Sequence, residues 1–161
     1  MNQFTPLIKG IITGILMVCI SLLVYYTNVP SDSGLHYSIY IIFAAGIMWT
    51  LFSFSRSDTF TGAFADLFGQ GFRCFIVATL IMVAFTAIFS MLHPEFAVEA
   101  AQYYREDLVK KGDKTPAEID KLVAASKKQY TTGIVYLTVF GYLITGAIIT
   151  AAGSAFLMRR K

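Results

Sequence analysis

Charge is scarce in this 161-residue chain. Asp, Glu, Lys and Arg make up 14% of it, against about 25% in an average soluble domain. Hydrophobic residues make up 56%, which excludes disorder and argues against an ordinary globular domain. The net charge is only +3 and the basic residues are dispersed or lie beside acids, so we expect no nucleic-acid binding. Two cysteines, Cys19 and Cys74, do not predict a disulfide framework.

The apolar runs of the chain contain no Asp, Glu, His or Arg. Lys9 lies at the end of the first run, where its side chain can extend toward the membrane surface. Coupled transporters and proton pumps normally keep an ionisable group within the membrane, and general acid–base catalysis needs a titratable group. The sequence therefore disfavours both classes, and we expect no catalytic residue, no cofactor and no metal site.

A phosphate-binding glycine loop is also missing. Residues 60–75 read FTGAFADLFGQGFRCF, but the Walker loop needs a lysine and none occurs between residues 10 and 109. The dinucleotide fingerprint needs a third glycine after a strand, whereas GQGFRC ends in cysteine and follows no strand. This glycine-rich stretch must have another purpose.

What the chain does contain is four apolar runs that could cross a bilayer, residues 7–26, 37–54, 75–92 and 134–158. A hydrocarbon core of about 30 Å needs about 20 helical residues, and roughly 17 is the lower limit. The first run lacks a small-residue cleavage site, so we expect a retained span. We predict an all-α fold, a four-transmembrane-helix bundle that forms a single membrane domain over residues 1–161.

Basic residues near the span ends predict the orientation of the bundle. Six cations lie close to span ends on one side, whereas most of the seven in the long polar insert lie farther from a span. The six are Lys9, Arg56, Arg73, Arg159, Arg160 and Lys161. We therefore predict that both chain termini are cytoplasmic.

Phenylalanines recur at helical spacing just before the third apolar run. At 100° per residue they fall within an arc of roughly 120°. They are Phe60, Phe64, Phe68, Phe72 and Phe75. Because Asp66, Gln70 and Arg73 fall on the opposite side, the pattern predicts an interfacial amphipathic helix over residues 60–74, with the aromatic face on the membrane. Its polar face is either simply solvated or the mouth of a binding site.

The polar insert after the third run carries helix start and stop signals. Pro94 and Gly112 bound a first helix over residues 94–111. The capping box TPAE, which begins at Thr115, starts a second over residues 116–129. We predict a helical hairpin outside the bilayer.

The surface of this predicted hairpin, residues 94–129, offers His93, Glu95, Tyr103 and Tyr104 for interactions. A histidine and one nearby carboxylate are too few ligands for zinc. A helix start is the simpler interpretation of His93 and Glu95 than a metal or proton-relay site.

Small residues at four-residue spacing predict close helix packing in the first and fourth runs. They are Gly10, Gly14, Gly146, Thr150 and Ser154. The partner helix could belong to the same chain or to another.

Together these features resemble a family of bacterial four-span membrane proteins catalogued as a domain of unknown function. The resemblance rests on LIKGIITGIL at the start of the first span, on Gly62, Phe64, Phe68 and Gly71, on the proline and acid after the third span, and on the helical insert and small-residue fourth span. Family members commonly carry Asp where this chain has His93. The resemblance implies a bacterial inner-membrane location and a role beside a glycosyltransferase acting on polyprenyl phosphate.

Three functions remain open at this point. The first is a non-enzymatic scaffold or accessory subunit in the lipid bilayer, bound to a membrane protein or to a second copy of itself. The second is a small transporter or lipid-handling protein with Asp66 and Arg73 at its mouth. The third is an enzyme acting on lipid-linked substrates through His93 and Glu95. The lack of charge within the spans and the well-defined extramembrane helices favour the first.

Overall fold

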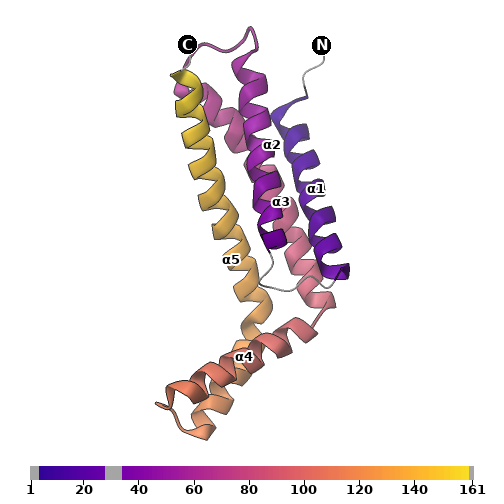
Figure 1. Ribbon diagram of the computed structural model, residues 1–161, viewed down its shortest axis with the longest axis vertical. Helices are drawn as coiled ribbons and strands as arrows, with labels where there is room; N and C mark the ends of the chain where they lie inside the picture. Colours follow the sequence, from indigo (N-terminus) through magenta and orange to yellow (C-terminus); the bar gives the residue numbers. More distant parts are fainter. Residues whose placement is uncertain (1–3, 28–33, 160–161) are drawn as a thin grey trace. The chain divides into compact units, whose positions relative to one another are not determined.

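The computed structural model describes residues 4–27 and 34–159 (Figure 1). Arg160 and Lys161, which contributed to the predicted orientation, lie outside these residues. The described chain is helical and contains no strand, so the all-α prediction is confirmed for it. Its helices are α1 (Pro6–Tyr26), the short 3-10 helix η1 (Gly34–Tyr37), α2 (Ser38–Ser55), α3 (Phe64–Leu92), α4 (Glu95–Lys111) and α5 (Pro116–Met158).

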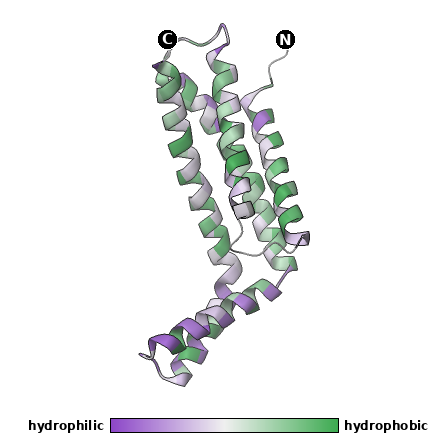
Figure 2. Cartoon of the chain, viewed as in Figure 1, coloured by the Kyte–Doolittle hydropathy of each residue, from purple (hydrophilic) through white to green (hydrophobic). Residues whose placement is uncertain are grey.

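Four of these helices, α1, α2, α3 and α5, are long and apolar enough to cross a membrane. Figure 2 shows hydrophobic residues along all four, whereas α4 and the first turns of α5 are mostly hydrophilic. Large apolar side chains are exposed along them, including Leu7, Ile11, Ile15, Leu23, Ile41, Leu80, Ile88, Leu137, Ile144 and Ile148. Exposed apolar surface on this scale marks a membrane contact. The chain is a membrane protein with four candidate spans.

The predicted break between an interfacial helix over residues 60–74 and a span over 75–92 is absent. A single helix, α3, covers most of both segments. Gly62, at φ 89°, lies in the loop just before it, but no proline or left-handed residue interrupts the helix afterwards. A glycine inside a helix costs about 1 kcal/mol, and at Gly69 and Gly71 this cost does not break α3. The sequence of α3 therefore changes from mixed to apolar composition without a break in the helix.

The same correction applies to the fourth span. Predicted helices over residues 116–129 and 134–158 are one helix of 43 residues, α5. Between them only Gly133 disfavours helix, and a single glycine does not end one. The polar hairpin segment and the apolar span are thus continuous.

The chain forms two compact units, Met1–Met82 with Val139–Lys161, and Val83–Thr138. The first unit contains α1, α2, the start of α3 and the end of α5. The largest fully buried side chains belong to it: Met17, Phe43, Ile47, Leu51, Leu67 and Phe75. The second contains the end of α3, α4 and the first part of α5.

Glycines set the helix spacing in the first unit. A Cβ atom at Gly10 would lie 2.5 Å from the carbonyl oxygen of Cys74, and one at Gly146 would lie 2.7 Å from the Phe75 ring. Neither position has room for a side chain. The two glycines allow the membrane helices to approach each other closely. An added Cβ would lie within 3.0 Å of a neighbouring atom also at Gly14, Gly46, Gly71 and Gly153.

In the second unit, residues 112–115 connect α4 to α5. Gly112 adopts φ 66° and its N–H donates to the Leu108 carbonyl at 3.3 Å, which ends α4 as the sequence predicts. The Glu118 carboxylate accepts from the Thr115 backbone N–H at 2.8 Å. The Thr115 hydroxyl donates to that carboxylate instead of accepting from the Glu118 amide, which bonds the Thr115 carbonyl. The capping box is therefore formed in one direction only.

Candidate functional site

The predicted phenylalanine face divides in the structure. Phe75 is 1% exposed and packs on Gly146, whereas Phe72 is 45% exposed and Phe64 is also exposed. Phe60 lies before α3 and is half-buried, as is Phe68. Neighbouring rings from Phe64 to Phe75 lie 5.1–6.3 Å apart. The face of α3 that packs inside the helix bundle therefore differs from the predicted phenylalanine face. Of the five phenylalanines, only Phe75 lies on both faces.

The polar residues on the other side of α3 do not gather at one point. Asp66 accepts a hydrogen bond from the Thr61 hydroxyl, which closes the loop before α3. Arg73 is exposed, and no ion pair joins it to Asp66 in the described residues. Gln70 is half-buried and lines a cavity. Of the predicted mouth, Gln70 lines this cavity and Asp66 and Arg73 do not.

This cavity, of about 190 Å³, lies where α1 and α3 begin and α2 ends. Its walls are Phe4, Thr5, Pro6, Lys9, Thr50, Phe54 and Gln70. The Thr50 hydroxyl donates to the Gly46 carbonyl at 3.0 Å, so its hydrogen is already engaged. The donors that remain at the wall are the Gln70 amide, the Lys9 ammonium and the Thr5 hydroxyl, whose oxygen accepts from the Ile8 N–H.

Lys9 is only 4% exposed. Its Nζ lies 5.4 Å from the centroid of the Trp49 ring, and no carboxylate forms an ion pair with it across the described chain. Lys9 Nζ is not among the buried polar atoms that lack a hydrogen-bond partner in the described residues, so the ammonium reaches the cavity. Lys9 therefore brings to the cavity a positive charge that no carboxylate of the described residues pairs with.

The position of Lys9 differs from the sequence prediction of a side chain extended toward the membrane surface. Lys9 lies one residue before Gly10 and four before Thr13, on the face of α1 that packs against the other helices. The Thr13 hydroxyl donates to the Lys9 carbonyl at 2.8 Å. The spacing from the small residues of α1 was the signal in the sequence that Lys9 faces inward.

In the second unit, His93 and Glu95 meet at the start of α4. His93 Nδ1 lies 2.6 Å from Glu95 Oε1, and the His93 ring lies 4.4 Å from the Phe89 ring. A bond to the backbone N–H of Glu95 itself and the bond to His93 lower the pKa of the Glu95 carboxyl. No group of three metal-ligating side chains occurs among the described residues. The pair lies at the start of α4, where Pro94 is the N-cap and makes no side-chain cap bond.

We predict that the Glu95 carboxylate stabilises the start of α4 in a pH-dependent way. Because its pKa is lower in the folded chain, the stabilisation is present above the ordinary glutamate pKa and disappears as the pH falls through the lowered value. In an NMR titration of carboxyl-labelled protein, the Glu95 midpoint should be depressed. The change His93→Ala should raise that midpoint only partway, since the backbone bond remains. An unchanged midpoint in His93→Ala would contradict this account.

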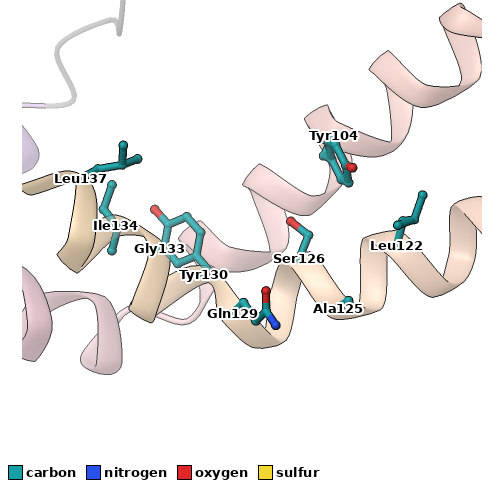
Figure 3. Close-up of a pocket in the computed structure, with 9 residues that line it drawn as sticks. All are labelled: Tyr104, Leu122, Ala125, Ser126, Gln129, Tyr130, Gly133, Ile134 and Leu137. Atoms are coloured by element: carbon teal, nitrogen blue, oxygen red, sulfur yellow. The ribbon is translucent and has the colours of Figure 1, made fainter.

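A larger open groove runs along α5 in the second unit, with a volume of about 470 Å³. Figure 3 shows Tyr104 extending from α4 on the side of α5, while the remaining lining residues follow α5. They are Leu122, Ala125, Ser126, Gln129, Tyr130, Gly133, Ile134 and Leu137. A Cβ added at Gly133 would meet no atom within 4 Å. Tyr103, also predicted as a surface residue, is exposed but does not line the groove.

A sequence profile described as "Protein of unknown function (DUF4199)" matches residues 9–159. The chain belongs to the DUF4199 family. Searches of curated proteins and of solved structures find no match.

The DUF4199 match covers the whole groove and, of the cavity, Lys9, Thr50, Phe54 and Gln70, while Phe4, Thr5 and Pro6 precede it. It confirms the resemblance to a domain of unknown function that the sequence suggested. Sequence reasoning identified Gln70 and Tyr104 as candidates and missed Lys9, Thr50 and the small residues of the groove.

Proposed function

We propose that this DUF4199 protein is a non-enzymatic accessory subunit of a complex in the bacterial inner membrane. In this proposal α4 and the first half of α5 lie outside the bilayer as a hairpin that docks a second membrane protein. The groove along α5 is the observation that supports it. Arg105 and Asp120 form an ion pair between the two helices, and Leu108 and Ile119 are buried, so the groove stands on a defined scaffold.

The lining of the groove suits a helix of a partner. Ala125 and Gly133 give it a low floor on α5, and Tyr104 and Leu122 give it apolar sides. Small residues allow a second helix to approach closely, and apolar groove walls accept the apolar face of an amphipathic helix. The Gln129 amide can hydrogen-bond a polar residue at its rim. The resemblance to the family suggests a polyprenyl-phosphate glycosyltransferase as this partner.

The charge distribution supports a cytoplasmic location for the span ends that are not joined to the hairpin. Four described basic residues lie near these span ends: Lys9 in the first turn of α1, Arg56 directly after α2, Arg73 in the first third of α3 and Arg159 directly after α5. Positive charge near span ends favours the cytoplasmic side. The hairpin would then lie on the outer side of the membrane, where it can meet the external part of a partner.

A photoreactive amino acid at Ala125 tests the docking function. Ala125 lines the groove, and its neighbour Ala124 is equally small and exposed but does not line it, so it is the matched control. In native membranes we expect a discrete adduct with another membrane protein from position 125 and at least several-fold less from 124. An adduct of twice the chain mass would identify the partner as a second copy. Equal patterns from both positions would refute docking at the groove.

A second candidate is a small transporter or lipid-handling protein, favoured by the presence of Gln70 in the Lys9 cavity. Asp66 and Arg73 would lie at the mouth of the path. If so, Asp66→Ala and Arg73→Ala should reduce flux or lipid transfer in reconstituted vesicles. Rates equal to those of the unchanged protein would eliminate this candidate.

A further inference from the structure

We infer that the cavity formed by Lys9, Gln70 and the ends of α1, α2 and α3 binds a phosphate oxyanion. The inference is independent of both functions proposed above, because it requires neither a partner on the hairpin nor movement of a lipid. It starts from the burial of Lys9 without an anionic partner in the described residues.

A buried ammonium is normally paired with an anion or with several hydrogen-bond acceptors. Here the Trp49 ring lies on one side of Lys9, and the cavity lies on another. The Gln70 amide and the Thr5 hydroxyl are further donors at the cavity wall, where Thr5 is the N-cap of α1 and Pro6 its first residue. The positive end of a helix dipole also favours an anion. All these features select for negative charge.

The size and position of the cavity narrow the range of ligands that it can bind. Its volume of about 190 Å³ lies below the roughly 300–1,000 Å³ of pockets for drug-sized molecules, so a headgroup or a small anion fits better than a whole metabolite. Lys9 lies in the first turn of a candidate span, and the ends of a span are where a helix meets the lipid headgroups. Phe4 and Phe54 add apolar walls beside the polar groups. A lipid phosphate or a free phosphate would supply the same oxyanion.

Trp49 reports on binding directly, because it is the only tryptophan of the chain and contacts Lys9. The full chain in neutral detergent is titrated with dihexanoyl phosphatidic acid, with inorganic phosphate at constant ionic strength, and with dihexanoylglycerol, which lacks phosphate. We expect a saturable change in Trp49 emission with dihexanoyl phosphatidic acid and none with dihexanoylglycerol. A similar change with inorganic phosphate would show that the free anion suffices. No change with either phosphate probe, or an equal change with dihexanoylglycerol, would overturn the inference.

The variant Lys9→Gln should weaken the apparent affinity for the phosphate probe about tenfold, since it removes a charge-assisted hydrogen bond. Arg56→Gln removes an exposed cation after α2 and is the matched control, with an expected change below about twofold. Unchanged affinity in Lys9→Gln, or equal loss in both variants, would count against the site. Should Lys9→Gln fail to fold, Gln70→Leu takes its place, and the titration of the unchanged chain remains decisive.

Discussion

Replacing Gly10 with alanine will destabilise the protein, whereas the same replacement at Gly69 will stabilise it. A Cβ at Gly10 would lie 2.5 Å from the backbone carbonyl oxygen of Cys74 and 2.9 Å from Val77 Cβ, and the helix backbone cannot move aside without disturbing the bundle. Overpacking of this kind costs about 1–3 kcal/mol. At Gly69 a Cβ meets nothing within 4 Å, so alanine adds up to about 1 kcal/mol through helix propensity.

Thermal unfolding of both variants in the same detergent, followed by circular dichroism, measures the two effects. The pair is informative because the chemical change is identical and only the surroundings differ. If Gly10→Ala unfolded at the same temperature as the unchanged protein, the close approach of α1 to α3 would be wrong.

The second large effect concerns the phenylalanines of α3. Phe75→Ala should lower the free energy of unfolding by about 3 kcal/mol, because it leaves a cavity beside Gly146 and Phe43. Phe72→Ala should cost less than about 1.5 kcal/mol, since the exposed ring loses mainly its edge contact with Phe75. Detergent-dependent unfolding curves for the two variants give both values. A larger loss for Phe72→Ala than for Phe75→Ala would contradict the placement of α3, because it would show that Phe72 is the ring buried in the bundle.

Hydropathy alone identified the four helices that are apolar enough to span a membrane, because apolar runs of this length have few alternatives in a chain with so little charge. The small residues Gly10 and Gly146 could also be predicted at helix contacts, since close packing needs small side chains at regular spacing. Their partners could not be predicted. Which helix faces which glycine depends on the rotation of each helix, and spacing along one helix does not encode it.

The predicted helix boundaries within α3 and α5 were wrong for a different reason. Prediction divided α3 and α5 where the composition changes from polar to apolar, but a helix ends only where a residue disfavours its backbone. Gly112, in the left-handed conformation, ends α4, whereas Gly69 and Gly133 interrupt nothing. A change from polar to apolar composition along the sequence is therefore poor evidence for a break in a helix.

Lys9 shows why the candidate site was only partly predictable. In the sequence it looks like a charged residue flanking a span, and most such residues extend toward the headgroups. Its burial depends on Trp49 and Gln70, which are 40 and 61 residues away and join it only in the folded bundle. Gln70 in turn was predicted on a face that is either solvated or the mouth of a site, and it is half-buried at the cavity.

Cys19 provides the most direct test of the claim that the exposed apolar helices lie in lipid. Its side chain is exposed in the isolated chain and lies within α1, whereas Asp113 is exposed in the connection between α4 and α5. In open native membrane fragments we expect a water-soluble maleimide to modify the thiol introduced by Asp113→Cys and to leave Cys19 unmodified, while both react after denaturation in SDS. Modification of Cys19 at a rate similar to that of the introduced thiol would show that water reaches the middle of α1, and the account would be wrong.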